Sequence, residues 1–154
     1  MRLDHNDIRE LNLLKYWRVI RKWTSRQYGI TEPEVELLVQ LDCLGRFLYQ
    51  DYVNATYLMT WNKLRWSKLK KLGFIGVWRK GQKGRVGYKT IFTTTVMCRK
   101  MVNRMYDIAL GKEDIPLDKR SATYHNKSYT EKVINKVLND MNQDETRNNE
   151  HDKN

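Results

Sequence analysis

Phosphate binding is the chemistry for which the residue types of this chain are best suited. Residues 52–106 contain thirteen Lys and Arg and no Asp or Glu, although the chain of 154 residues has eighteen acids. An ordinary solvated surface mixes charges of both signs. A surface that binds a polyanion gains free energy by releasing condensed counterions, and a carboxylate within it repels the partner. This distribution predicts a polyanion-binding surface and accounts for the formal net charge of +11.

Ten polar side chains in this span are the candidate DNA contacts. Short donors and acceptors near the start of an expected helix can read base edges in a major groove; they belong to Thr60, Asn62, Lys63 and Ser67. Two lysines near its end suit phosphate contacts, and these are Lys70 and Lys71. Four cations of a glycine-rich stretch are expected on the DNA backbone or in the minor groove, where arginine is favoured: Arg79, Lys80, Lys83 and Arg85.

Apolar periodicity predicts the helices that precede these residues. Apolar residues at three- and four-residue steps indicate a long amphipathic helix over about residues 7–28, ended by Gly29. Thr31 is suited to cap a second helix, which Gly45 ends. A short third helix is expected over roughly residues 47–53.

A fourth helix, over about residues 56–72, is expected to present the base-reading side chains. Its buried stripe is predicted to consist of Leu58, Trp61, Leu69 and Leu72, with the stem of Arg65 among them. Its opposite side is polar and includes Ser67 and Lys70. It is therefore the expected recognition helix.

A β-hairpin is predicted over residues 76–93, because two β-prone runs flank a basic tip that is rich in glycine. The tip, Gly-Gln-Lys-Gly-Arg-Val-Gly, lacks the Lys-Ser/Thr pair of a nucleotide-binding P-loop. Glycine here is better explained by the bend of the chain.

Two further helices are expected after the hairpin. One of the threonines 93–95 caps the fifth helix, which runs to about residue 110. A polar linker over residues 112–127 leads to a sixth helix over residues 128–142, and residues 143–154 are expected to be disordered.

The inventory of reactive groups predicts no enzyme, no cofactor and no metal site. Cys43 and Cys98 show no CxxC spacing and no nearby histidines, and both are expected to be buried in helices. The acids lie toward the ends of the chain, with no nucleophile and base between them. Two isolated cysteines and the absence of a long apolar run predict a cytoplasmic protein that does not enter membranes, in the nucleoid or, for a viral protein, in the host cytoplasm.

The order of these elements resembles a winged helix-turn-helix, and more narrowly the multiple-antibiotic-resistance regulator (MarR) family. The residues that carry this resemblance are "GIT" before the second helix, "KLKKLGFI" before the hairpin and "FTTT" before the fifth helix. The resemblance implies a winged-helix domain over residues 1–111 and dimerisation by the flanking helices, of which residues 128–142 form one. The hairpin tip departs from this family, because no acid is present to orient Arg85.

These observations favour a sequence-specific, homodimeric regulator of transcription that binds double-stranded DNA. One alternative is an architectural or replication-associated protein that uses the same charges without sequence preference. A second is an RNA or single-strand binder that stacks bases on Trp66, Trp78 and Tyr88. Nothing in the sequence indicates a small-molecule effector.

Overall fold

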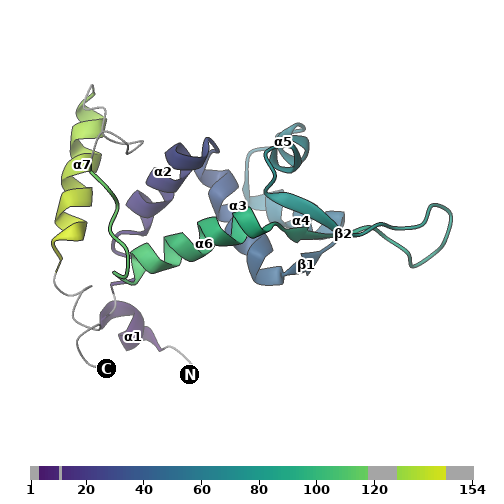
Figure 1. The fold of residues 1–154 in the computed structure, drawn as a ribbon, viewed down its shortest axis with the longest axis horizontal. Coiled ribbons are helices and arrows are strands. Elements are labelled where there is room, and N and C mark those ends of the chain that lie inside the picture. Colours follow the sequence, from purple (N-terminus) through teal and green to yellow (C-terminus); the bar gives the residue numbers. More distant parts are fainter. Residues whose placement is uncertain (1–3, 11, 118–127, 145–154) are drawn as a thin grey trace. The chain divides into compact units, whose positions relative to one another are not determined.

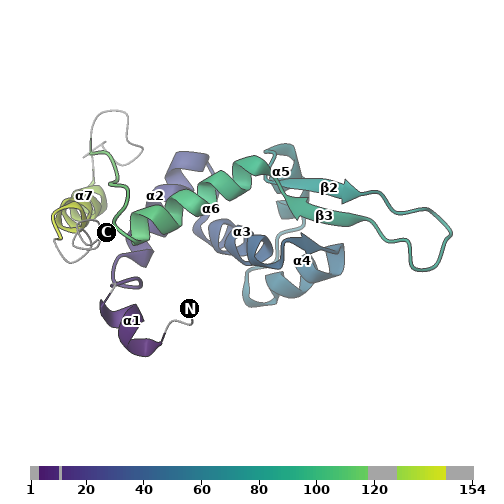
Figure 2. The same cartoon turned by 60° about the horizontal axis from the view of Figure 1, so that its bottom comes forward.

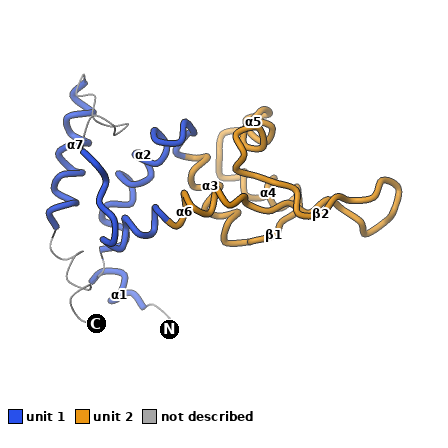
Figure 3. The backbone as a smooth tube through the Cα atoms, viewed as in Figure 1, with its two compact units in different colours: residues 1–32, 104–154 blue, residues 33–103 orange. Residues whose placement is uncertain are grey.

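Two compact units make up the chain in the computed structural model, which describes residues 4–10, 12–117 and 128–144. Residues 1–32 and 104–154 form unit 1, and residues 33–103 form unit 2 (Figure 3). Most of the described residues are helical, and unit 2 holds a small antiparallel sheet of three strands. The expected mainly helical fold is confirmed, with a third strand added to the predicted hairpin.

Unit 1 contains helices from both ends of the chain. Its elements are α1 (His5–Glu10), α2 (Trp17–Tyr28), the last part of α6 (Val96–Ala109) and α7 (Tyr129–Asn142). The prediction of one helix over residues 7–28 was wrong, because the chain leaves the helical path after α1. Asn12 adopts a left-handed conformation with φ 49°, which asparagine tolerates better than most residues but which a helix cannot continue through.

Helix α7 begins and packs as its sequence predicts. The Ser128 hydroxyl accepts a hydrogen bond from the Glu131 N–H, and the Glu131 carboxylate accepts one from the Ser128 N–H. Ile134 and Leu138 are buried, and Asp144 accepts hydrogen bonds from Lys15 and Tyr16 at 2.7 and 2.6 Å. Residues 118–127 of the expected linker and 145–154 of the expected disordered tail lie outside the described residues.

Unit 2 surrounds the three-stranded sheet with short helices. Its elements are most of α3 (Glu32–Leu44), β1 (Arg46–Phe47), α4 (Tyr49–Ala55), the 3-10 helix η1 (Thr56–Leu58), α5 (Arg65–Lys71), β2 (Ile75–Arg79), β3 (Ile91–Thr94) and the first part of α6 (Figure 1). The strand order is β1-β3-β2. In Figures 1 and 2 the chain between β2 and β3 extends well beyond α4 and α5.

The third helix begins later than predicted, because Phe47 belongs to a strand. Phe47 pairs with Phe92 of β3, and both side chains are buried. A two-residue strand has too little sequence to show a period, and its partner lies 45 residues further along the chain. The helix α4 then starts at Tyr49, where the Asp51 carboxylate accepts a hydrogen bond from the Leu48 N–H at 2.7 Å.

The expected fourth helix over residues 56–72 is interrupted. Only η1 and α5 are helical, and residues 59–64 connect them without helical structure. The Asn62 side chain accepts a hydrogen bond from the Leu64 N–H at 2.9 Å, and such local bonds compete with helical ones. Arg65 also donates from Nη2 to the Thr60 carbonyl at 2.9 Å. Both contacts favour the bent connection over a continuous helix.

The interruption changes which side chains are buried. Leu58 and Trp61 were expected in the core but are 99% and 74% exposed, and Leu72 is also exposed. Leu69 and the stem of Arg65 are buried as predicted. Among the apolar side chains of residues 56–72, only Leu69 of α5 therefore belongs to the core of unit 2.

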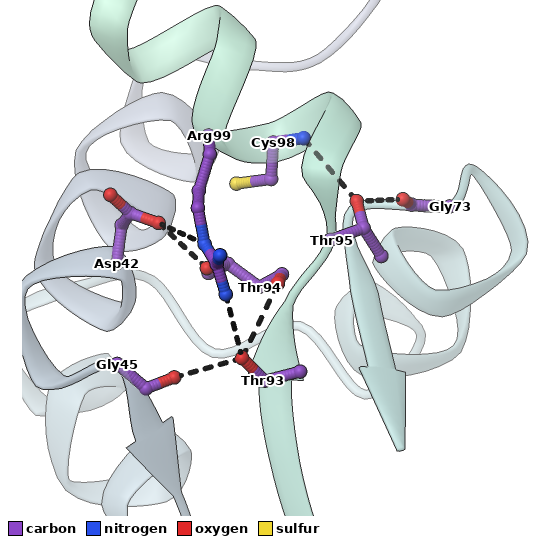
Figure 4. Close-up of polar contacts among 8 residues, drawn as sticks. All are labelled: Asp42, Gly45, Gly73, Thr93, Thr94, Thr95, Cys98 and Arg99. Atoms are coloured by element: carbon purple, nitrogen blue, oxygen red, sulfur yellow. Dashed lines mark hydrogen bonds and ion pairs between the residues drawn. The ribbon is translucent and has the colours of Figure 1, made fainter. Parts of the chain in front are cut away.

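A cluster of threonines fixes β3 to the rest of unit 2 (Figure 4). Thr94 is buried and donates to the Asp42 carboxylate at 2.6 Å, and Thr93 donates to the Gly45 carbonyl at 3.0 Å. Thr95 donates to the Gly73 carbonyl, and its hydroxyl also accepts from the Cys98 N–H at the start of α6. These contacts hold the base of the hairpin between α3 and α6.

We predict that Thr94→Val lowers the free energy of unfolding by about 1–3 kcal/mol, because it leaves the Asp42 carboxylate without its buried donor. Asp42→Ala should cost a similar amount, and the double variant should cost less than the sum of the two, because the variants remove the same bond. Urea denaturation of the three variants measures this coupling. Strict additivity would show that the bond contributes nothing.

The two cysteines differ in exposure. Cys98 is buried as expected, and burial raises the pKa of its thiol to about 12. Cys43 was expected to be buried, but it is exposed, because it lies on the outer side of α3.

We predict that a thiol reagent at pH 8 modifies one cysteine of the native protein rapidly and both in denaturant. The reactive species is the thiolate, and burial keeps the Cys98 thiol protonated at that pH. Cys43→Ser should abolish the rapid reaction, whereas Cys98→Ser should leave it intact. Two equally fast thiols in the native protein would contradict the burial of Cys98.

Candidate nucleic-acid interface

The positive charge of the chain is concentrated in unit 2. Residues 33–103 carry thirteen Lys and Arg against four Asp and Glu, so this unit accounts for +9 of the formal charge of +11. The remaining +2 belongs to unit 1, which is therefore close to neutral. Long-range attraction to a polyanion is therefore expected from unit 2.

Four of the thirteen cations between residues 52 and 106 are engaged within the protein. Lys68 pairs with the buried Glu34 at 2.7 Å, Arg99 lies 4.0 Å from Asp42, and Arg104 pairs with Glu113 at 2.6 Å. Arg65 is itself buried. The Glu113 hydrogen bond raises the pKa of Arg104. The pairing of Lys68 with Glu34 removes this lysine from the set of free charges.

The nine remaining cations are exposed and form no ion pair within the described residues. They are Lys63, Lys70, Lys71, Arg79, Lys80, Lys83, Arg85, Lys89 and Lys100. All nine belong to unit 2. Three of the four acids of this unit are engaged in the structural contacts described above, namely Glu34, Asp42 and Asp51.

All ten predicted DNA contacts are exposed, but their positions differ from the prediction. Ser67, Lys70 and Lys71 lie on α5, whereas the non-helical connection carries Thr60, Asn62 and Lys63. The hairpin carries Arg79, Lys80, Lys83 and Arg85. The surface therefore has three parts: the connection, α5 and the hairpin.

The hairpin tip is shaped by close backbone approach. A Cβ atom at Gly81 would lie 2.4 Å from the Tyr88 carbonyl oxygen, so only glycine fits there. The Gln82 N–H donates to the same carbonyl at 3.0 Å. The glycine at this position is thus explained by the close approach of its backbone to residues 88–90.

Arg85 at the tip is held without an acid. Its guanidinium lies 4.6 Å from the centroid of the Tyr88 ring, and its Nη1 donates to the Gln82 side chain at 3.4 Å. A cation over an aromatic face is attracted without loss of its charge. The arginine therefore keeps its full positive charge for a polyanion.

Sequence reasoning missed two groups beside this surface. Arg46 of β1 lies 3.9 Å from the centroid of the exposed Trp78 ring. Tyr49, Tyr52, Trp66 and Phe92 form a second aromatic cluster, in which Tyr52 and Trp66 have ring centroids 4.5 Å apart. Both groups depend on pairing between β1 and β3, which the local sequence does not show.

Known proteins provide no further guide to this surface. No family model matches the chain, and no curated protein or solved structure matches it either. Across residues 4–10, 12–117 and 128–144, no three His, Cys, Asp or Glu side chains are grouped as metal ligands. In the same ranges no helix has the length and apolarity needed to cross a membrane.

Proposed function

We propose that unit 2 binds double-stranded DNA and that the protein is a sequence-specific regulator of transcription. The observation that carries this proposal is the set of nine exposed cations without an acidic partner within the described residues. Eight of them lie on the connection, α5 and the hairpin, and the ninth, Lys100, lies on α6. Phosphates along a duplex supply the complementary charge at regular spacing.

The element order supports a winged helix-turn-helix of the MarR type. A helix, a short strand, two helices, a hairpin and a helix follow one another, and β1 lies beside β3. In this proposal α5 enters the major groove and the hairpin lies on the backbone or in the adjacent minor groove. The residues of the connection then approach the duplex from the loop before α5.

Competition with random DNA tests sequence specificity. Oligonucleotides selected from a random pool by the full chain should bind at least about a thousandfold more tightly than random duplex. Equal affinity would favour the architectural or replication-associated alternative. Better competition by single strands would favour the RNA or single-strand alternative.

The proposed homodimer predicts a two-fold symmetric site. Half-sites should be spaced by about 10 base pairs or a multiple of that distance. A footprint on the selected sequence measures the spacing, and an asymmetric footprint would contradict the dimer.

We predict that Lys71→Ala and Thr60→Ala have different effects on binding. Lys71 is expected on a phosphate, so its loss should reduce the salt dependence, d log K/d log[salt], by about one and leave sequence preference unchanged. Thr60 is expected at a base edge, so its loss should relax the preference at one position at constant salt dependence. Titrations of selected and mismatched duplexes at several salt concentrations separate the two effects.

A further inference from the structure

A small cavity lies beside the proposed DNA surface, between α4 and the connection. Its volume is about 90 Å³. Its walls include four aromatic rings and two polar side chains, which belong to Tyr49, Tyr52, Trp61, Trp66, Asn62 and Arg65. All belong to unit 2.

Arg65 forms one wall of this cavity. Its side chain is only 6% exposed, and its Nη2 donates to the Thr60 carbonyl at 2.9 Å. Its Nε is buried and has no hydrogen-bond partner. Because the Nη2 hydrogen bond ties Arg65 to the Thr60 carbonyl, this wall is fixed relative to the connection.

The aromatic rings define the shape of that ligand. Trp66 lies edge-on to Tyr49 at 5.0 Å between ring centroids, and it contacts Tyr52 as described above. Trp61 is largely exposed at the edge of this cluster, although a large apolar ring in water is unfavourable without a partner. Aromatic rings stack on planar groups. Their faces offer no hydrogen-bond donors or positive charge to a free phosphate. The cavity therefore favours a flat ligand that carries hydrogen-bond acceptors.

We propose that this cavity receives an unpaired nucleobase of the DNA that unit 2 binds. The inference rests on the proposed function, since the duplex supplies the base. The base would stack on Trp61, and its carbonyl or ring nitrogen would accept a hydrogen bond from the side-chain amide nitrogen of Asn62. The amide nitrogen is the group of Asn62 that donates, because its side-chain oxygen already accepts from the Leu64 N–H. Unit 2 then prefers a duplex with an unstacked or extruded base.

Two duplexes of the same sequence test this proposal with the full chain. One is fully paired, and the other carries a single bulged 2-aminopurine, whose fluorescence falls when it stacks. We expect the bulged duplex to bind about tenfold more tightly, as stacking of one base on an aromatic side chain implies. We also expect 2-aminopurine emission to fall on binding.

Trp61→Ala and Tyr57→Ala form a matched pair of variants. Tyr57 is 75% exposed and does not line the cavity, and Trp61 is 74% exposed and does. Because both side chains are exposed, both variants should fold. Trp61→Ala should remove the tenfold preference and the fall in emission, and Tyr57→Ala should change neither.

The outcomes separate this inference from the proposed function. Equal affinity for the two duplexes with unchanged emission would overturn the base-binding cavity and leave duplex binding intact. A loss of preference in both variants alike would also overturn it. Failure to bind either duplex would overturn the proposed function and this inference together.

Discussion

Reversal of two charges at the hairpin tip, Lys83→Glu with Arg85→Glu, should weaken binding to duplex DNA by roughly a hundredfold or more. Both side chains are exposed and have no acidic partner among the described residues. The double variant changes the charge of the tip by four units, so it removes counterion release and adds repulsion from phosphates. The thermal midpoint of unfolding should not change, because both side chains are exposed and Arg85 contacts Gln82 and Tyr88 within the tip itself.

A matched control distinguishes a local contact from net charge. Lys132→Glu with Lys136→Glu changes the total charge equally, but on the exposed side of α7 in unit 1. A gel-shift titration should show a loss for this pair that is at least tenfold smaller. Equal losses would mean that only the net charge matters, and no loss for the hairpin pair would exclude the hairpin from the interface.

Leu69→Ala should lower the free energy of unfolding by about 2–5 kcal/mol, whereas Leu58→Ala should change it by less than about 0.5 kcal/mol. Leu69 of α5 is fully buried, whereas Leu58 is 99% exposed. A continuous helix over residues 56–72 would bury both leucines, so the pair also tests the interruption at residues 59–64. Urea denaturation measures both costs. Similar large costs for both variants would indicate that residues 56–72 form a continuous helix.

The sequence predicts elements whose start and end signals are local. Helix α3 ends before Gly45, which has φ 71°, and α7 begins at its capping box. The threonine start of α6 and the two strands of the hairpin were also correct. In each case the decisive residues lie within a few positions of the element, so a short window of sequence contains the signal.

The errors arise where distant or side-chain contacts decide the conformation. The strand β1 exists because Phe47 meets Phe92 across the sheet, and no residue near Phe47 predicts that pairing. The connection before α5 depends on the Arg65 contact with the Thr60 carbonyl. Apolar residues at helical spacing, such as Leu58, are therefore compatible with a segment that is not helical.

The candidate interface was predicted as a charge distribution but not as a geometry. All ten candidate side chains are exposed, as a charged surface predicted from the sequence requires. The engagement of Lys68 by Glu34, 34 positions earlier in the chain, could not be foreseen from spacing. The cavity beside Trp61 was missed because the periodicity assigned that side chain to the core.

The dependence of duplex affinity on salt concentration tests the central claim most directly. The full chain should bind a duplex with a plot of log K against log[salt] of slope about −4 or steeper, as expected when about five phosphates are neutralised. A slope shallower than about −1, or no binding at low salt, would contradict the claim that the exposed cations of unit 2 bind DNA.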